Sequence, residues 1–174
     1  IDKIIAKIKN DPEPKSVKLI ESSLWKRIKD AATQGRRTGL GITGLGDALA
    51  MLGTTYGSDT SVATTEEIYK WLSLNSYESS IQLAIERGAF PVWNYEKEKN
   101  HQFINQIVTE LLPARQEDYK HYGRRNIANT TTAPAGSVSV LTQTTSGIEP
   151  AFMLHYTRRK KLNPNDENAS VDFV

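Results

Sequence analysis

The stretch RRTGLGITGLGDALAMLG, residues 36–53, carries the most distinctive local pattern of the chain. Gly39, Gly41 and Gly44 have the G-x-G-x-x-G spacing that, in dinucleotide-binding folds, follows a buried strand and opens a helix. Here small and polar residues precede Gly39, and Asp59, the acid at the ribose-binding distance, follows no second strand. We therefore interpret the glycines as a crowded turn that permits close backbone packing, and keep a nicotinamide oxidoreductase as a less favoured alternative.

Composition narrows the class of protein. The chain has 174 residues, a net charge of +2 and no cysteine. The absence of cysteine excludes disulfides, cysteine-ligated zinc and thiol chemistry carried by the chain itself. The small net charge does not favour nucleic acid, and no apolar run is long enough for a membrane span. Because IDKIIAKIKN is too charged for a signal peptide, we expect a cytoplasmic protein. The chain begins with Ile1 rather than Met and stops at VDFV, so we expect it to be a piece of a larger protein.

Apolar residues at helical spacing predict that the first half is mainly helical. The expected helices cover residues 1–10, 14–33, 47–53, 65–87 and 105–114. Thr64 and Glu67 have the capping-box spacing that marks the start of the 65–87 helix. Its expected buried stripe consists of Ile68, Trp71, Leu72, Ile81, Ala84 and Ile85.

The second half is richer in Thr, Asn and Ser. NIANTTTA, residues 126–133, has the β-branched content of a strand, and AFMLHYTRRKK, residues 151–161, alternates as a further strand does. SVSVLTQ, residues 137–143, is predicted to open a helix after Pro134 and Gly136.

A turn that feeds a helix is a candidate phosphate site, because the first N–H groups of a helix are free and its dipole favours an anion. Small residues in TTTAPAGSVS allow a phosphate to approach the backbone, and the serines add hydroxyl donors. The candidate site residues are Pro134, Ala135, Gly136, Ser137, Val138 and Ser139. The alternative is an ordinary helix start without a ligand.

The remaining polar residues favour no second site. His101, His121 and His155 lack the spacing of metal ligands, so we predict no metal centre. The basic run at residues 158–161 is most simply a solvated edge.

Several segments together resemble one family, the large catalytic subunit of ribonucleotide reductase. They are GRRTGLGITGLGDALAMLG, SSIQLAIERGAFP, YGRRNIANTTTAPAGSVSVLTQTTSGIEPAF and YTRRKKLNP. Within them, residues 123–126 are similar to the family's G-x-R-N step, residues 134–137 to its Pro-Thr-Gly-Thr turn, and residues 146–150 to its S-G-I-E-P motif. The resemblance runs from about Pro12 to near the end of the chain.

The resemblance implies an α/β fold: a helix-rich segment of the ten-stranded barrel of these reductases, with few short strands. We expect residues 1–174 to form a single segment of the catalytic barrel domain, mainly helical over 1–113 and rich in strands and turns over 124–174. In the family the Pro-Thr-Gly-Thr turn holds the substrate's phosphates. Ala135 replaces the threonine of that turn, which removes one hydroxyl contact and leaves the backbone donors.

The motifs are most similar to class II, which implies adenosylcobalamin as the cofactor of the complete enzyme, with none bound by this chain alone. Class I, which uses a separate radical-generating subunit, is the near alternative. The implied partners are a ribonucleotide substrate and the remainder of the reductase polypeptide, with possible self-association and with neither nucleic acid nor membrane.

The family's radical and redox cysteines are absent from this chain. We therefore expect no catalytic residue here and no turnover by the isolated chain. A non-catalytic scaffold or interaction module is the alternative from a different functional class.

Overall fold

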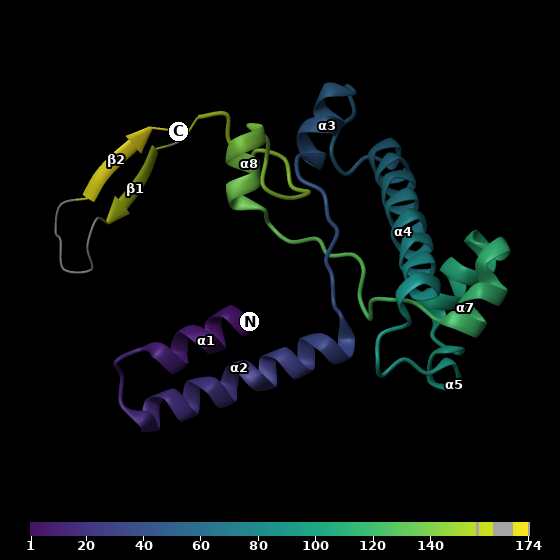
Figure 1. Cartoon of the computed structure of the whole chain (residues 1–174). Coiled ribbons are helices and arrows are strands. Elements are labelled where there is room, and N and C mark those ends of the chain that lie inside the picture. The colour runs from purple at the N-terminus through teal and green to yellow at the C-terminus, as the bar shows by residue number, and fades with distance from the viewer. Residues whose placement is uncertain (156, 162–168, 174) are drawn as a thin grey trace. The chain divides into compact units, whose positions relative to one another are not determined.

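The computed structural model describes residues 1–155, 157–161 and 169–173 (Figure 1). The chain divides into two compact units, and each is built from two separate stretches of sequence. Unit 1 comprises residues 1–41 and 66–132, and unit 2 comprises residues 42–65 and 133–174. Among the described residues, no helix combines the length and the apolar character needed to cross a membrane.

Unit 1 begins with a helical hairpin formed by α1 (Asp2–Asn10) and α2 (Lys15–Gly35), as the periodicity predicted (Figure 1). The Lys29 ammonium lies 2.6 Å from the Asp2 carboxylate, and the Lys18 ammonium donates to the Lys9 carbonyl over 3.1 Å. Ile8 of α1 is buried, whereas α2 buries no residue. The apolar side chains of α2 therefore remain largely exposed.

Helix α4 (Asp59–Arg87) begins earlier than the predicted Thr65. The Ser61 N–H donates to the Ser58 hydroxyl over 3.3 Å, which places the cap at Ser58. The Thr64 hydroxyl instead donates to the Thr60 carbonyl over 2.8 Å, one turn back within the helix. The predicted capping box is thus wrong, because Thr64 lies inside the helix.

The core of unit 1 forms where α4 packs against shorter helices. The predicted 105–114 helix is divided among α6 (Gln102–Asn105), a π-helix η1 (Gln106–Leu111) and a 3₁₀ turn η2 (Pro113–Arg115), and α5 (Tyr95–Glu98) and α7 (Gln116–Tyr122) flank them. The core cluster consists of Tyr77, Ile81, Ile104, Ile107, Val108 and Tyr119. Ile81 and Ala84 of the predicted α4 stripe are buried, but Trp71 and Ile85 are 56% and 36% exposed.

The predicted strand at residues 126–133 is extended but forms only an isolated parallel bridge, between Leu40 and Thr130. Backbone bonds surround this bridge: the Leu40 N–H donates to the Asn129 carbonyl over 2.8 Å, and the Thr131 N–H donates to the Leu40 carbonyl over 2.9 Å. A Cβ atom on Gly41 would overlap the Thr131 carbonyl oxygen, so glycine permits this approach.

Unit 2 contains α3 (Leu45–Met51) and α8 (Gly136–Thr142), which lies where residues 137–143 predicted a helix. β1 (Thr157–Lys161) pairs antiparallel with β2 (Ala169–Phe173), with Thr157 opposite Phe173. Residues 151–155 of the predicted 151–161 strand belong to no strand. Residues 156, 162–168 and 174, including part of the resemblance at YTRRKKLNP, lie outside the described residues.

The expected α/β class, a barrel segment with few short strands, is therefore wrong for the part of the chain that the structure describes. Helices dominate, and the only two strands there pair antiparallel with each other near the C-terminus. A parallel barrel needs strands with parallel neighbours, and parallel pairs are stable chiefly inside extended, covered sheets. The Leu40–Thr130 pair has no third strand beside it among these residues, so it remains a bridge.

Candidate functional site: a turn at the start of α8 and an adjoining pocket

The candidate phosphate turn lies at the N-terminus of α8. Ala135 is the N-cap residue, and the first bond of the helix runs from the Ser139 N–H to the Ala135 carbonyl over 2.8 Å. The N–H groups of Gly136, Ser137 and Val138 therefore have no acceptor within the helix. No side chain caps this end, so three backbone donors are available to an anion.

The two candidate serines differ in their surroundings. Ser139 is only 6% exposed, and its hydroxyl donates to the Gly136 carbonyl over 2.9 Å, so this hydroxyl is engaged within α8. Ser137 is exposed. Apart from its chain neighbours and the backbone of α8, no heavy atom lies within 4 Å of the position that a Cβ atom on Gly136 would occupy, which leaves the backbone open to a close approach.

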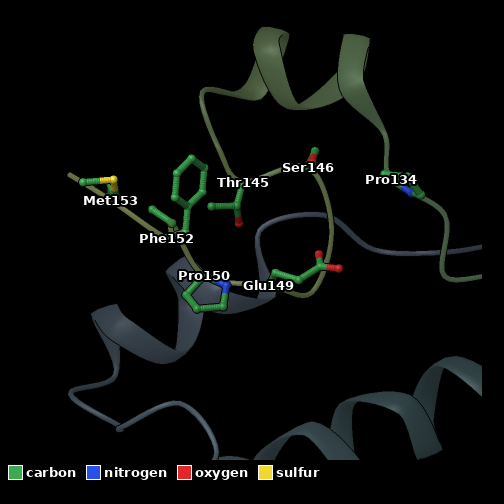
Figure 2. Close-up of a pocket in the computed structure, with 8 residues that line it drawn as sticks. Pro134, Thr145, Ser146, Glu149, Pro150, Phe152 and Met153 are labelled. Atoms are coloured by element: carbon green, nitrogen blue, oxygen red, sulfur yellow. The ribbon is translucent and has the colours of Figure 1, made fainter. Parts of the chain in front are cut away.

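Pro134 lies at the edge of an open pocket of about 420 Å³ in unit 2 (Figure 2). The other lining residues are Thr145, Ser146, Glu149, Pro150, Ala151, Phe152 and Met153. Pro134 is the only one of the six candidate residues in this lining. The Ala135 N–H nevertheless donates to the Ser146 carbonyl over 2.7 Å, which fixes the turn beside the pocket wall.

The wall of the pocket is held by α3. The Asp47 carboxylate accepts the Thr145 N–H over 2.7 Å, and the Gly44 N–H donates to the Thr145 carbonyl over 3.0 Å. A Cβ atom on Gly46 would lie 2.5 Å from Cα of Pro150, so only glycine allows α3 to approach the loop this closely. The glycine-rich stretch thus has a packing role, as the sequence interpretation proposed.

Among the described residues of the pocket lining, one buried polar side-chain atom has no hydrogen-bond partner. The Thr145 hydroxyl oxygen is buried and makes no hydrogen bond in the described part of the chain. Buried polar groups are nearly always paired, so an orphan hydroxyl beside a pocket is a group that a bound polar ligand can satisfy. Glu149 lines the same pocket and offers a carboxylate acceptor (Figure 2).

A second polar cluster, in unit 1, is centred on Glu98 of α5. Arg124 is 4% exposed, and its guanidinium binds both Glu98 carboxylate oxygens, with Nε at 3.2 and 3.1 Å. The Tyr119 hydroxyl and the Trp93 indole N–H donate to Glu98 Oε2 over 2.7 and 3.0 Å. The carboxylate is therefore almost enclosed by donors.

These contacts set the protonation of the cluster. Burial alone raises the pKa of Glu98, but the hydrogen bonds from Arg124, Tyr119 and Trp93 and the charge of Arg124 together lower it below its usual value. Burial and the hydrogen bond to Glu98 raise the pKa of Tyr119. Glu98 stays ionised and Tyr119 stays protonated at neutral pH. These protonation states indicate that the cluster stabilises the structure of unit 1 and does not transfer protons.

The residues that follow Arg124 in the G-x-R-N step, at 123–126, make further hydrogen bonds to the ends of two helices. Arg125 donates to the Arg87 and Gly88 carbonyls over 2.7 and 2.8 Å, at the end of α4. The Asn126 amide donates to the Arg36 carbonyl over 2.8 Å, after the end of α2. The residues of this motif thus join the ends of α4 and α2 to the extended segment that follows the motif in unit 1.

Other predicted features form no site among the described residues. No group of three or more His, Asp or Glu side chains there could hold a metal ion. Sequence reasoning missed Thr145 and Glu149 as pocket residues, although the recognised S-G-I-E-P motif already contained Glu149. It also missed Glu98, for which no sequence pattern gave a signal.

Comparison with known proteins agrees with the resemblance. Residues 15–168 match the family described as "Ribonucleotide reductase, barrel domain". The chain is 34% identical over 131 residues to a vitamin B12-dependent ribonucleoside-diphosphate reductase of Mycobacterium tuberculosis, which covers 75% of the chain and 16% of the relative. It is 31% identical over 132 residues to the protein of the same name from Thermoplasma acidophilum, covering 76% of the chain and 15% of the relative.

A ribonucleoside-diphosphate reductase subunit alpha of Treponema pallidum is 27% identical over 128 residues, covering 72% of the chain and 15% of the relative. The chain therefore belongs to the ribonucleotide reductase barrel-domain family. It spans about one sixth of the length of these curated relatives.

Proposed function

We propose that this chain supplies the substrate-phosphate wall of a ribonucleotide reductase, which converts ribonucleotides to deoxyribonucleotides by radical chemistry. The phosphate-binding residues are Pro134, Ala135, Gly136, Ser137, Val138 and Ser139. The observation that carries the proposal is the set of three free N–H groups at the start of α8, held next to the pocket by the bond from Ala135 to Ser146. Membership of the family supports the same assignment.

In this proposal, different residues contact the phosphates and the sugar of the substrate. The N–H groups of Gly136, Ser137 and Val138 donate to phosphate oxygens, and the exposed Ser137 hydroxyl adds a fourth donor. Glu149 repels phosphate, so its carboxylate accepts from sugar hydroxyls instead. The unpartnered Thr145 hydroxyl completes the polar contacts on that side of the pocket.

Adenosylcobalamin is the cofactor that we propose for the complete enzyme, in line with the names of the relatives from Mycobacterium tuberculosis and Thermoplasma acidophilum. When bound, it supplies the radical. Drug-sized ligands occupy pockets of about 300–1,000 Å³. The pocket of about 420 Å³ therefore suits a sugar phosphate and not a corrin ring, so no residue of this chain is assigned to the cofactor.

The chain has no cysteine, so any thiol chemistry of the complete enzyme comes from other residues. We accordingly expect the purified chain to reduce no ribonucleotide. A class I reductase segment is the second candidate, favoured by the relative named subunit alpha from Treponema pallidum. For either class we propose a cytoplasmic location, and a non-catalytic scaffold remains the alternative that the kinetic test below excludes or supports.

The test is steady-state kinetics of Ser137→Pro in the reductase that contains this chain. Proline removes one backbone donor and constrains Gly136, the residue before it. We expect KM for the ribonucleotide to rise by about tenfold or more, since a hydrogen bond to a charged group contributes about 1.5–3 kcal/mol. We expect kcat to change less, because ground state and transition state share the phosphate contact.

Ser137→Ala is the matched control, because it removes the hydroxyl and keeps the backbone N–H. Its KM should rise less than that of Ser137→Pro. An unchanged KM in a properly folded Ser137→Pro enzyme would mean that other residues hold the phosphates.

A further inference from the structure

The helical hairpin of unit 1 carries a pocket whose lining is dominated by lysine. Its volume is about 360 Å³, and it is lined by Lys9, Lys15, Lys18, Leu19, Ser22 and Lys26. Lys9 comes from the last turn of α1, and the other five residues lie on one face of α2 at helical spacing. No carboxylate lines this lysine pocket.

The positive charges of the lysine pocket are largely uncompensated. In the part of the chain that the structure describes, the ammonium groups of Lys9, Lys15 and Lys26 have no hydrogen-bond or ion-pair partner. Only Lys18 is engaged, by its 3.1 Å bond to the Lys9 carbonyl, and this bond ties the end of α1 to the wall of the pocket. Clustered like charges repel each other, so a bound anion relieves a real electrostatic cost.

The dipole of α2 adds to this charge. Lys15 is the first residue of α2, and the first turn of the helix contains no acid. A cation at this position is unfavourable, because the N-terminus of a helix is itself positive. The lysine side chains and the N-terminus of α2 therefore both favour a negatively charged ligand.

The volume of the lysine pocket and the chemistry of its side chains indicate the class of ligand. A volume of about 360 Å³ is at the lower end of small-molecule sites, which run from about 300 to 1,000 Å³. Lysine binds phosphate as a point charge, and several lysines around one cavity match several phosphate groups. The Ser22 hydroxyl offers one neutral donor, and Leu19, which is 71% exposed, gives an apolar contact at the rim.

We propose that the lysine pocket binds a small anion with two or more phosphate groups. This site does not include the turn at residues 134–139, and it stands whether or not that turn binds substrate. The ligand is either an inorganic polyphosphate or the polyphosphate tail of a nucleotide, since both present the same chemistry to the lysines.

The test is isothermal titration calorimetry of the whole chain at low salt, with sodium tripolyphosphate and with ADP as separate probes. We expect binding of one equivalent that weakens as salt is added, because exposed charges are screened. Tighter binding of ADP assigns the site to nucleotides, and tighter binding of tripolyphosphate assigns it to inorganic polyphosphate. Absence of binding by both probes at millimolar concentration would overturn the proposal.

The decisive variant is Lys15→Gln with Lys26→Gln, which should weaken binding by about tenfold or more, since charge-assisted contacts are lost. Lys97→Gln with Lys120→Gln removes the same charge from exposed positions on α5 and α7, and should change the affinity by less than about twofold. An equal loss of affinity in both double variants would mean that the net charge of the chain, and not the lysine pocket, determines binding, and would overturn the proposal. Loss of binding in Ser137→Pro but not in the lysine variant would mean that the probes bind at the turn of residues 134–139, and would overturn the proposal. Tighter binding of a glutamate heptapeptide than of either phosphate probe would also overturn it, because the pocket would then suit an acidic protein.

Discussion

The Glu98 carboxylate accepts hydrogen bonds from three different side chains. Arg124 donates to both of its oxygens, and Tyr119 and Trp93 donate to Oε2. A buried ion pair of this kind is not a large net source of stability, because both charges lose their hydration. Removing only one partner of the pair is costly, since the remaining charge stays buried without a partner.

Glu98→Gln is therefore expected to destabilise the chain by about 3–5 kcal/mol, the range for breaking a buried pair. The glutamine keeps the size of the side chain but leaves the buried Arg124 guanidinium uncompensated. Chemical denaturation followed by circular dichroism measures the loss. Glu96→Gln, which breaks the exposed Lys99–Glu96 pair on the same helix, is the control and should have little effect. Equal stability of the two variants would show that the enclosure of Glu98 contributes nothing.

At the scale of elements, the contact between α3 and the 144–150 loop depends on the absence of a side chain at Gly46. In Gly46→Ala, the new Cβ would meet Cα of Pro150 at 2.5 Å and its nitrogen at 2.6 Å. These are backbone atoms, so α3 or the loop must shift. We expect a loss of about 1–3 kcal/mol in the free energy of unfolding, as for overpacked cores.

Thermal melting of Gly46→Ala beside Gly136→Ala tests this expectation. Apart from chain neighbours and the backbone of α8, a Cβ on Gly136 meets no heavy atom within 4 Å, and the φ of Gly136 is not positive, so this control variant should keep its stability or gain slightly. A Gly46→Ala chain that melts with the wild type would show that the loop adjusts freely.

Periodicity predicted α1 and α2, because residues 3–4 apart decide which face of a helix is apolar. It failed at the start of α4, since Ser58 and Thr64 are both acceptable caps and only the path of the chain selects one. The strand at 126–133 failed for another reason. β-branched residues favour extended backbone, but a strand needs a neighbour, and sequence does not reveal which neighbours are present.

The candidate site was predictable only in part. The Pro-Ala-Gly-Ser turn and the helix after it follow from local chemistry, and the helix begins at Gly136 as that chemistry requires. The pocket beside the turn is lined by Thr145 and Glu149, and Thr145 is held there by its N–H bond to the Asp47 carboxylate and by the bond from the Gly44 N–H to its carbonyl. Those bonds join residues 98 and 101 positions apart, so no short window of sequence contains both partners.

At the scale of the whole molecule, the exposed apolar face of α2 is the most conspicuous surface of unit 1. Val17, Ile20, Leu24 and Ile28 are 37–72% exposed along this face. Contiguous apolar patches on soluble chains are commonly covered by a protein contact. In the isolated chain, a second copy is the available cover.

We therefore expect the 19.4 kDa chain to self-associate as its concentration rises, which sedimentation velocity measures as an increasing average mass. Ile20→Glu with Leu24→Glu should keep it monomeric without loss of folding, because both side chains are already exposed. Ser16→Glu with Ser23→Glu adds the same charge beside the apolar face and should leave association in place. A wild-type mass that stays at the monomer value at every concentration would contradict the prediction.

The bond between Trp93 and Glu98 gives the chain a built-in optical probe. Trp25, Trp71 and Trp93 are its three tryptophans, and the Trp93 indole donates to the enclosed Glu98 carboxylate, whereas Trp71 donates to the carboxylate of the exposed Glu67. With Trp25 and Trp71 replaced by phenylalanine, the emission wavelength of the remaining indole reports the opening of the Glu98 cluster alone. Fluorescence can then follow the interior of unit 1 at concentrations far below those at which the exposed face of α2 meets a second copy.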